Sequence, residues 1–499
     1  MAIAKVLGLE TEYGIAVKGS ADPNPIAASS ALINAYVAEL SRRVGWDFED
    51  ETPGRDARGF SREAAAPPEI ETHLVNAVLT NGARYYVDHA HPEYSTPECS
   101  TVREVVTYDK AGELILARSV EAAGRLLPPG QQLVVLKNNS DGKGNSYGTH
   151  ENYLMDRAAP FGRVVAHVIP HFVSRQIYTG SGKVGCEASG AVTPSGFQLT
   201  QRADFFEEEV GLETTLKRPI VNTRDEPHCN AQKYRRLHVI NADANLSEVA
   251  TFLKVGTTAL ILSMVEDDWY NRAGARDLAL QAPVAAMRKV SYDLSLREPL
   301  ALANGPSMSA LDIQWEQLDL ARKYAEDLGT ESVGGSEAGA EILAVWEEVL
   351  SALESDPMSL ADRLDWVAKY RVVDGYRLRH DSSWDDPKLA LMDLQYHDVR
   401  PERSLFARLG MRRLVGADEI ERAVTEPPET TRAYFRGQCL KRWASSVAAA
   451  NWDSMVFDVG SDPLRRVPMM EPLRGTKAHV DQLLNSVSSP AELVERLGS

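Results

Sequence analysis

The sequence predicts an α+β fold, in which an antiparallel sheet is covered by helices on one face and carries polar side chains on the other. Residues 84–88 and 234–239 alternate between polar and apolar side chains, as strands do when only one of their faces is buried. From residue 246 onward, apolar residues recur at helical spacing in five segments: 246–266, 276–290, 308–328, 337–355 and 358–373. Antiparallel sheets often leave one face uncovered, so we expect the polar faces of the strands to line a functional site.

Composition and charge narrow the class of protein. Of the 499 residues, 43% are hydrophobic and 25% are charged, as in an ordinary globular protein. The net charge of -17 argues against broad binding to nucleic acid or to anionic membranes. The four cysteines are far apart and form no Cys-x-x-Cys pair, which indicates neither a zinc site nor a disulfide framework. A signal-peptide pattern and a stretch of about eighteen apolar residues are both lacking, so we expect a cytoplasmic protein.

Residues 5–17 are predicted to form the first strand. Gly8, Glu10 and Glu12 fall on one face of it, and aligned carboxylates repel each other unless cations or solvent separate them. One interpretation is a solvated polar face. The other is a metal-binding strand, because Mg²⁺ prefers carboxylate oxygens and often completes its shell with phosphate.

The segment 81–99 is the most unusual part of the chain. In the predicted strand 84–88, Arg84, Tyr86 and Asp88 share one face. Pro92 is expected to end the ladder, and a turn or bulge is expected to redirect one of the two glutamates that follow, the first of which is Glu93. An edge strand with a hydrated polar face remains the alternative interpretation.

A helix is predicted over 28–44, and a long mobile loop over 46–72. The loop segment is rich in charged residues, glycine and proline and poor in aliphatic residues, so it cannot bury enough surface to order itself. Loops of this length are commonly either functional lids or disordered segments, and the sequence does not choose between these two.

The middle of the chain alternates helices and strands. We predict helices over 104–127 and 159–178, a strand over 133–139, a strand in which His150 and Asn152 face the same way, and a strand beginning at Phe197. In the last strand, Gln198, Thr200 and Arg202 are expected on one face. The segment GSGK at 180–183 lacks the spacing of a phosphate-binding loop and is interpreted as a turn.

Residues 217–245 hold the densest basic cluster of an acidic chain. In the predicted strand at its centre, Arg236 and His238 alternate with Leu237 and Val239. The cluster is suited to binding phosphates or a substrate carboxylate, and a surface network of ion pairs is the alternative. Its members are Arg224, His228, Arg235, Arg236 and His238.

The C-terminal part is predicted to form a small separate domain. Glu426-Pro427-Pro428 marks a plausible boundary, which gives a catalytic domain over 1–425 and a small domain over 426–499 that contains Trp452. The tryptophans of the helical part are expected in the core, and no internal repeat is found.

Several long blocks of the chain carry a resemblance to a known family. GLETEYG, NGARYYVDHAHPEYSTPEC, KNNSDGKGNSYGTHENYL, NTRDEPH, YRRLHVI and PLRGTKAHV together resemble the Pup ligase and deamidase family of actinobacteria, over nearly the whole chain. This resemblance implies a glutamine synthetase-like fold: a curved antiparallel sheet with helices packed on one face, plus a small C-terminal domain.

The family has two branches, and the chain is more similar to the deamidase/depupylase branch. The ligase pattern has one residue more between the aspartate and the glutamate of VDHAHPEYS and lacks the 46–72 insertion. The resemblance implies an amidase that converts the C-terminal glutamine of the small protein Pup to glutamate and cleaves Pup from substrate lysines. It implies ATP as a bound cofactor, Mg²⁺, and Pup and pupylated proteins as partners. We expect the protein to be a monomer.

The resemblance also implies roles for individual residues of this chain. These are Asp88 as the catalytic aspartate, Glu10, Tyr86 and Glu93 as magnesium-site residues, and Arg84, Thr96 and Trp452 as nucleotide-site residues. The local motif around Trp452, NWDSMVF, departs from the family pattern. Arg236 and His238 of the basic cluster are added as candidate cofactor-binding residues.

The chemistry of Asp88 can also be argued from its residue type. A carboxylate is ionised at neutral pH but is a weak nucleophile, so it needs a polarised carbonyl and a neutralised oxyanion, which magnesium ions and an arginine could supply. Whether it attacks the amide or positions water or phosphate stays open. Two alternative functions are a ligase that forms the same isopeptide bond and a non-catalytic adaptor that binds Pup.

Overall fold

The computed structural model describes residues 1–40, 43–49, 51–52, 54–59, 75–187, 196–215 and 217–498. Its centre is a six-stranded sheet in which every neighbouring pair is antiparallel, which confirms the predicted α+β class. In spatial order the strands are β13 (Tyr234–Val239), β8 (Thr149–Asp156), β1 (Leu7–Glu12), β6 (His91–Ser95), β5 (Arg84–Asp88) and β4 (Asn76–Val78).

The register of this sheet aligns polar residues from distant parts of the chain. Glu12 on β1 is opposite Glu93 on β6, which in turn is opposite Tyr86 on β5. One row further along, Glu10 lies between His150 on β8 and Ser95 on β6. Directly opposed residues project to the same face of a sheet, so these rows form one polar front.

The other face of the sheet is covered by helices, as predicted. Helix α1 (Pro25–Val37) packs on β5 and β6, α3 (Val102–Gly124) on β1, and α6 (Glu248–Glu266) on β8. The residues that point toward these helices, such as Leu9 and Tyr85, are buried in one continuous hydrophobic core. A capping box between Thr101 and Glu104 starts α3, so its first backbone N–H groups have partners.

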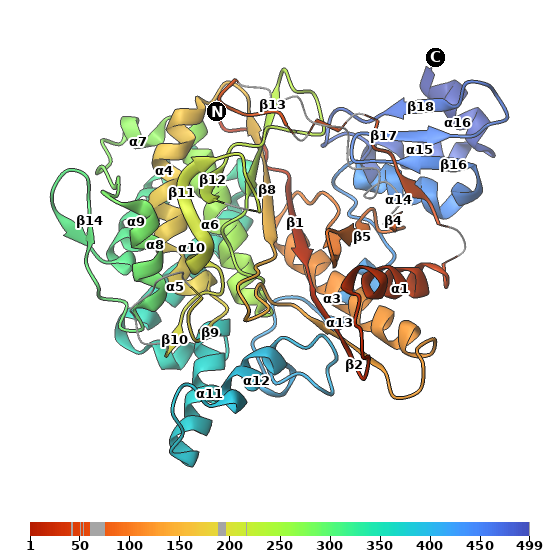
Figure 1. The fold of residues 1–499 in the computed structure, drawn as a ribbon. Helices are drawn as coiled ribbons and strands as arrows, with labels where there is room; N and C mark the ends of the chain where they lie inside the picture. Colours follow the sequence, from red (N-terminus) through yellow and green to blue (C-terminus); the bar gives the residue numbers. More distant parts are fainter. Residues whose placement is uncertain are drawn as a thin grey trace.

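Further helices build a layer behind the sheet and lie on the left in Figure 1. They are α4 (Phe161–Ser174), α5 (Gln176–Thr179), α7 (Trp269–Arg272), α8 (Pro283–Tyr292), α9 (Ala310–Leu328) and α10 (Ser336–Ser355). Helix α6 is long and apolar enough to cross a membrane by composition, but its apolar window is completely buried within the protein. Burial of this kind is typical of a core helix.

The remaining elements of this part are short strands and peripheral helices. The strand pairs are β2 (Gly14–Lys18) with β7 (Gln132–Leu136), β9 (Lys183–Val184) with β10 (Phe197–Gln198), β11 (Phe206–Gly211) with β12 (Arg218–Asn222), and β14 (Leu300–Ala301) with β15 (Ser307–Met308). The helices are α11 (Asp365–His380), α12 (Pro387–Tyr396) and α13 (Ala417–Ala423); α11 and α12 project at the bottom of Figure 1.

The C-terminal elements form a group at the upper right of Figure 1 with a hydrophobic cluster of their own. They are α14 (Ala433–Trp443), β16 (Val447–Ala450), β17 (Ser454–Phe457), β18 (Arg465–Pro468), α15 (Lys477–Ser486) and α16 (Pro490–Gly498). The cluster also includes Val44, Trp46 and Val78 from the N-terminal part. The boundary at 426 stays a prediction.

The beginning of the predicted loop 46–72 is packed against this C-terminal group. Strand β3 (Gly45–Trp46) pairs with β16, and Trp46 is buried. Further along, the backbone of Asp56 pairs with that of Arg224 in an isolated antiparallel β-bridge. The Asp56 carboxylate accepts a hydrogen bond from the hydroxyl of Thr223. The predicted mobile loop over 46–72 therefore begins with Trp46 in a strand and has Asp56 packed against residues 223–224. Residues 60–72 lie outside the described residues, so the loop stays a prediction there.

Three details of the predicted strands are wrong. The segment 5–17 is two strands, because the chain turns at Tyr13 and β2 pairs with β7 in another sheet. Pro92 lies inside β6 instead of ending it, and its carbonyl accepts a hydrogen bond from the Tyr13 N–H where β1 ends. Proline has no N–H to donate, but Pro92 lies near the end of its strand, so the ladder loses one hydrogen bond there. After Gln198 the chain bends, so Thr200 and Arg202 do not continue a strand.

Candidate active site

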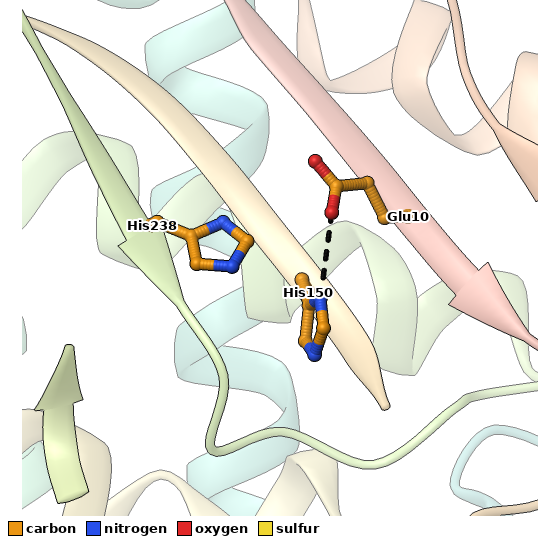
Figure 2. Close-up of side chains that lie close together, drawn as sticks. All are labelled: Glu10, His150 and His238. Carbon is orange, nitrogen blue, oxygen red and sulfur yellow. Dashed lines mark hydrogen bonds and ion pairs between the residues drawn. The ribbon is translucent and has the colours of Figure 1, made fainter. Parts of the chain in front are cut away.

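Three neighbouring strands contribute Glu10, His150 and His238 to one cluster on the polar front (Figure 2). One potential ligand atom from each of these side chains lies within 4.8 Å of the others. The Nδ1 atom of His150 is 3.4 Å from Oε2 of Glu10. One carboxylate oxygen and two imidazole nitrogens are a set of ligands that transition metals and zinc accept readily, and Mg²⁺ less readily.

The other groups around Glu10 are polar and mostly cationic. Asn152 donates to Oε1 of Glu10 at 2.9 Å, and Nη1 of Arg236 lies 3.6 Å from the same oxygen. Burial works to raise the pKa of Glu10, but the hydrogen bond from His150 and the charges of His238 and Arg236 bring this pKa well below its usual range. Glu10 is therefore an ionised carboxylate at neutral pH.

A second cluster consists of Glu12, Asp88 and Glu93, which also offer oxygens within 4.8 Å of one another. Glu12 and Glu93 are buried in the sheet, whereas the Asp88 side chain is 34% exposed at the end of β5. Alternation along β5 brings Arg84, Tyr86 and Asp88 to the same face, as predicted.

The charge of this second cluster favours either a proton on Glu93 or a bound cation. Burial, followed by the charges of Asp88, Glu12 and Glu10, holds the pKa of Glu93 well above its usual range. The pKa of Glu12 is instead about 2: burial opposes ionisation, but the hydrogen bond from His91, the charges of His150 and His91, and the Gly148 N–H outweigh it. Three carboxylates in contact, all with hard oxygen atoms, fit a divalent ion such as Mg²⁺.

Tyr86 and Arg84 form the outer edge of the site. The Tyr86 hydroxyl lies within hydrogen-bonding reach of Glu93, and burial followed by the charge of Glu93 raises the pKa of Tyr86 well above its usual range. The Arg84 guanidinium is 4.0 Å from the ring centre of Trp46 and 3.9 Å from that of Tyr86. It thus presents a fixed cation between two aromatic rings.

A pocket that is open to solvent lies beside the first cluster and reaches the C-terminal elements. Among its walls are Glu10, Thr96, Arg236 and Trp452. The Thr96 hydroxyl accepts a hydrogen bond from the Leu9 N–H at 3.0 Å, which fixes its position. Apolar surface from Val6, Leu154, Pro227 and Pro472 completes the pocket, so it offers both a flat apolar part and a charged end.

The pocket is tied to the C-terminal elements by Glu98. This residue accepts hydrogen bonds from Arg432 at 2.7 Å and from Arg436 at 3.2 Å, and Arg436 also donates to the carbonyl of Trp452. Burial opposes ionisation of Glu98, but the charges of Arg436 and Arg432 lower its pKa to about 2. Glu93 and Glu98 therefore have different surroundings, because β6 ends at Ser95 and Glu98 lies beyond the strand.

The sequence profile of the Pup-ligase protein family matches residues 5–456. The chain belongs to this family. It is 52% identical to the depupylase of Acidothermus cellulolyticus over 507 aligned positions, which cover 99% of both chains. It is 50% identical to the Pup deamidase/depupylase of Mycobacterium tuberculosis, again over 99% of both chains. Its identity to the Pup–protein ligase of Acidimicrobium ferrooxidans is 41%, over 90% of this chain and 99% of that protein.

Solved structures of family members show the same fold. The complex of the prokaryotic ubiquitin-like protein Pup with its ligase PafA superposes with a TM-score of 0.80 at 32% identity, over 97% of this chain and 92% of the other. The ligase PafA in complex with ADP superposes with a TM-score of 0.74 at 36% identity, over 82% and 89% of the two chains. These similarities confirm the fold that the resemblance to the Pup ligase family predicted.

The structure separates some of the predicted site residues of this family member. Glu10 and Glu93 lie in different clusters of possible ligand atoms, although the charge of Glu10 acts on Glu93. Arg235, a member of the predicted basic cluster, donates to the carbonyl of Ala159 away from the polar front. Glu12 and His150 are additional members of the clusters, and the alternation of residues 8–12 and 150–152 was the signal that pointed to them.

Two arginines at the end of the polar front, Arg202 and Arg218, were not predicted as site residues. Arg202 is buried and donates to the hydroxyl of Ser146 and the carbonyl of Ile240, while Arg218 donates to carbonyls of Thr214 and Ser146. Burial, followed by the charge of Arg218, lowers the pKa of Arg202 to about 10. Both guanidinium groups act on Glu12 through their charge, and they are suited to an anion at this end of the site.

Proposed function

We propose that this chain is an ATP- and Mg²⁺-dependent amidase that deamidates the C-terminal glutamine of Pup and hydrolyses the isopeptide bond between Pup and substrate lysines. The observation that carries this proposal is the full-length identity of 50% or more to depupylases, against 41% to a ligase. The spacing between Asp88 and Glu93, one residue shorter than in the ligase pattern, supports the same branch.

We assign the metal to the carboxylates of the polar front. Glu12 and Glu93 would bind Mg²⁺ with Asp88 beside them, and Tyr86 would orient Glu93 through its hydroxyl. Glu10, with His150 and His238, is a second place for a cation. When bound, Mg²⁺ supplies positive charge that polarises a carbonyl or phosphoryl oxygen.

The nucleotide is assigned to the pocket between the sheet and the C-terminal elements. Thr96 and Trp452 line this pocket, and the partly apolar wall is suited to a base. Arg236 lies at its charged end, and Arg84 presents a guanidinium fixed between two rings. The structure of a family ligase in complex with ADP supports a nucleotide site in this fold.

Asp88 is assigned the catalytic role, and two routes are compatible with its position. In one, a carboxylate oxygen attacks the amide carbonyl, the amine leaves with a proton, and water then cleaves the resulting anhydride. In the other, Asp88 takes a proton from a water molecule that attacks the carbonyl directly. After hydrolysis in H₂¹⁸O under single-turnover conditions, ¹⁸O in the Asp88 side chain would establish the first route, because water that attacks the Asp88 carbonyl of the anhydride leaves its oxygen there.

The ligase and the adaptor are the alternatives. A ligase would form the isopeptide bond that a depupylase hydrolyses. The observation in favour of a ligase is the 41% identity to a Pup–protein ligase. A non-catalytic adaptor would have no use for the cluster of three carboxylates that Asp88 forms with Glu12 and Glu93. We further propose that the protein is a cytoplasmic monomer that binds Pup and pupylated proteins but neither nucleic acid nor membranes.

One experiment tests the proposed function. The protein is incubated with glutamine-ended Pup and with a Pup-conjugated protein, with and without ATP and Mg²⁺, and the product masses are measured. We expect a gain of about one mass unit on Pup and release of the unmodified substrate, both only with nucleotide and metal. Formation of new conjugates from glutamate-ended Pup and a protein lysine, without any cleavage, would support the ligase instead.

A further inference from the structure

The turn that joins β5 to β6 places a histidine against the proposed catalytic carboxylate. Asp88 and His91 are the last pair of the hairpin, so His89 and Ala90 form the turn. The Nδ1 atom of His89 lies 3.0 Å from Oδ2 of Asp88. Because an ionised carboxylate only accepts hydrogen bonds, Nδ1 of His89 is the donor in this contact.

His89 makes this contact from an uncommon backbone conformation. Its φ is 51°, in the left-handed region that glycine, asparagine and aspartate favour in short turns. The turn is also held from α1, because the Ser29 hydroxyl donates to the carbonyl of Ala90 at 2.8 Å. The two-residue turn thus holds His89 in a defined conformation next to the Asp88 carboxylate.

The surroundings of Asp88 explain why its carboxylate needs a partner. Its side chain is 34% exposed, so the carboxylate could rotate toward water. The carboxylates of Glu12 and Glu93 lie in the same cluster and repel it away from the site. A donor on Oδ2 opposes both effects, since it fixes the rotation of the carboxylate and leaves Oδ1 for the substrate or the attacking water.

We propose that His89 is a positioning residue for Asp88. This inference rests on the proposed function, because it assigns His89 to the same amide-cleaving reaction. The His89 side chain is 62% exposed and lies outside the hydrophobic core, so its replacement should spare folding. Its loss should lower kcat while KM and nucleotide affinity stay unchanged, because the substrate still binds but meets a misoriented carboxylate.

Two variants separate the hydrogen bond from the backbone conformation. His89→Gly keeps the left-handed conformation without strain and removes the donor; His89→Asn adopts the same conformation and offers an amide N–H near the place of Nδ1. We expect kcat of His89→Gly to fall about tenfold to a hundredfold, as for the loss of a hydrogen bond to a charged group. His89→Asn should regain most of this loss.

A control variant tests the backbone change alone. Asp381 caps the C-terminal end of α11 with a φ of 48° and is exposed. Asp381→Gly therefore also replaces a left-handed residue by glycine, but outside the site, and it should leave kcat unchanged. Equal kcat values for His89→Gly and His89→Asn would overturn the inference, whether both are normal or both are reduced. So would a loss confined to KM or to nucleotide affinity.

A spectroscopic measurement tests the hydrogen bond without any enzymatic assay. With ¹⁵N-labelled histidine, we expect the His89 signal to show a proton on Nδ1 in the wild type and to change in Asp88→Ala, which lacks the acceptor. A proton on Nε2 alone would overturn the inference even if the chain cleaved nothing. A proton on Nδ1 in a protein that releases no product would instead contradict only the proposed function.

Discussion

Glu12 on β1 and Glu93 on β6 lie directly opposite each other in the centre of the sheet. Both side chains are buried, and Asp88 adds a third carboxylate to the same cluster. Like charges in opposed positions destabilise a sheet unless a cation separates them. We therefore expect the sheet to become more stable when a divalent ion binds at these carboxylates.

The first prediction concerns this link. At a free Mg²⁺ concentration about 100 times its dissociation constant, Mg²⁺ should add ~2.7 kcal/mol to the free energy of unfolding of the wild type. Because the raised pKa of Glu93 favours its neutral form without metal, Glu93→Gln resembles the metal-free site, so the metal-free variant should be no less stable than the wild type but should gain little from Mg²⁺. Thermal unfolding with Mg²⁺ and with chelator measures both effects. Glu347→Gln, a change on the exposed side of α10, is the control and should respond as the wild type does; an equal gain in Glu93→Gln would refute the assignment.

A second prediction concerns Glu10, which lies in the other cluster and in the wall of the pocket. We expect excess chelator, or Glu10→Ala, to abolish both nucleotide binding and cleavage, because a polyphosphate needs metals to approach a front lined by carboxylates. Calorimetric titration with ATP tests this directly. Undiminished ATP binding in chelator would show that the metal is not part of the nucleotide site.

Arg84 is the subject of the third prediction. Its guanidinium is stacked between Trp46 and Tyr86, so both its charge and its flat shape fit the site. Arg84→Ala should weaken ATP binding roughly tenfold, and Arg84→Lys should restore only part of this, since an ammonium group keeps the charge but cannot stack. The measurement is ATP affinity at fixed Mg²⁺; full recovery in Arg84→Lys would mean that the stacking is irrelevant to binding.

The fourth prediction is a pH dependence of stability at Glu98. Its pKa in the folded protein is about 2, against about 4.3 for an unperturbed glutamate, so the folded state holds fewer protons than the unfolded state between these values. The stability from the contacts with Arg436 and Arg432 is complete above about pH 4.3 and is lost as pH falls toward 2. Glu98→Gln should cost about 3 kcal/mol at pH 7.

Urea unfolding of the wild type and Glu98→Gln at pH 7 and at pH 3 tests this point. The difference in unfolding free energy between the two proteins should shrink markedly at pH 3. A difference that is the same at both pH values would show that the carboxylate charge of Glu98 contributes nothing, and that the variant is destabilised through packing.

The sequence predicted those features of the site that depend on neighbouring residues. Arg84, Tyr86 and Asp88 share a face because side chains alternate along any strand, and residues 84–88 carry no break in that pattern. The antiparallel class and the covering helices also followed from periodicity. The resemblance to the Pup ligase family predicted the fold as a whole, and the similarity to the solved ligase structures confirms it.

The features that the sequence missed depend on residues that are distant along the chain. Glu10 and Glu12 are two positions apart on one strand, but their partners differ, because His150 and His238 lie beside Glu10, and Asp88 and Glu93 beside Glu12. Trp46 begins a segment of charged composition, yet it is buried because β3 pairs with β16. Strand order and register, which local patterns do not encode, decide such contacts.

The central claim is that the Asp88 carboxylate performs the cleavage. Asp88→Asn keeps the size of the side chain and the strand geometry but removes the charge, so folding and ATP affinity should change little. Tyr86→Phe should differ from it and act partly on metal binding. Asp319→Asn, an exposed aspartate on α9, serves as the matched control.

The most direct measurement is the rate of amide cleavage by Asp88→Asn at saturating ATP and Mg²⁺, with calorimetric ATP binding on the same preparation. We predict a fall by several orders of magnitude, because neither attack by the carboxylate nor base-assisted attack by water survives its loss. A variant that binds ATP normally and keeps most of its cleavage rate would show that Asp88 is a structural acid and would contradict the account.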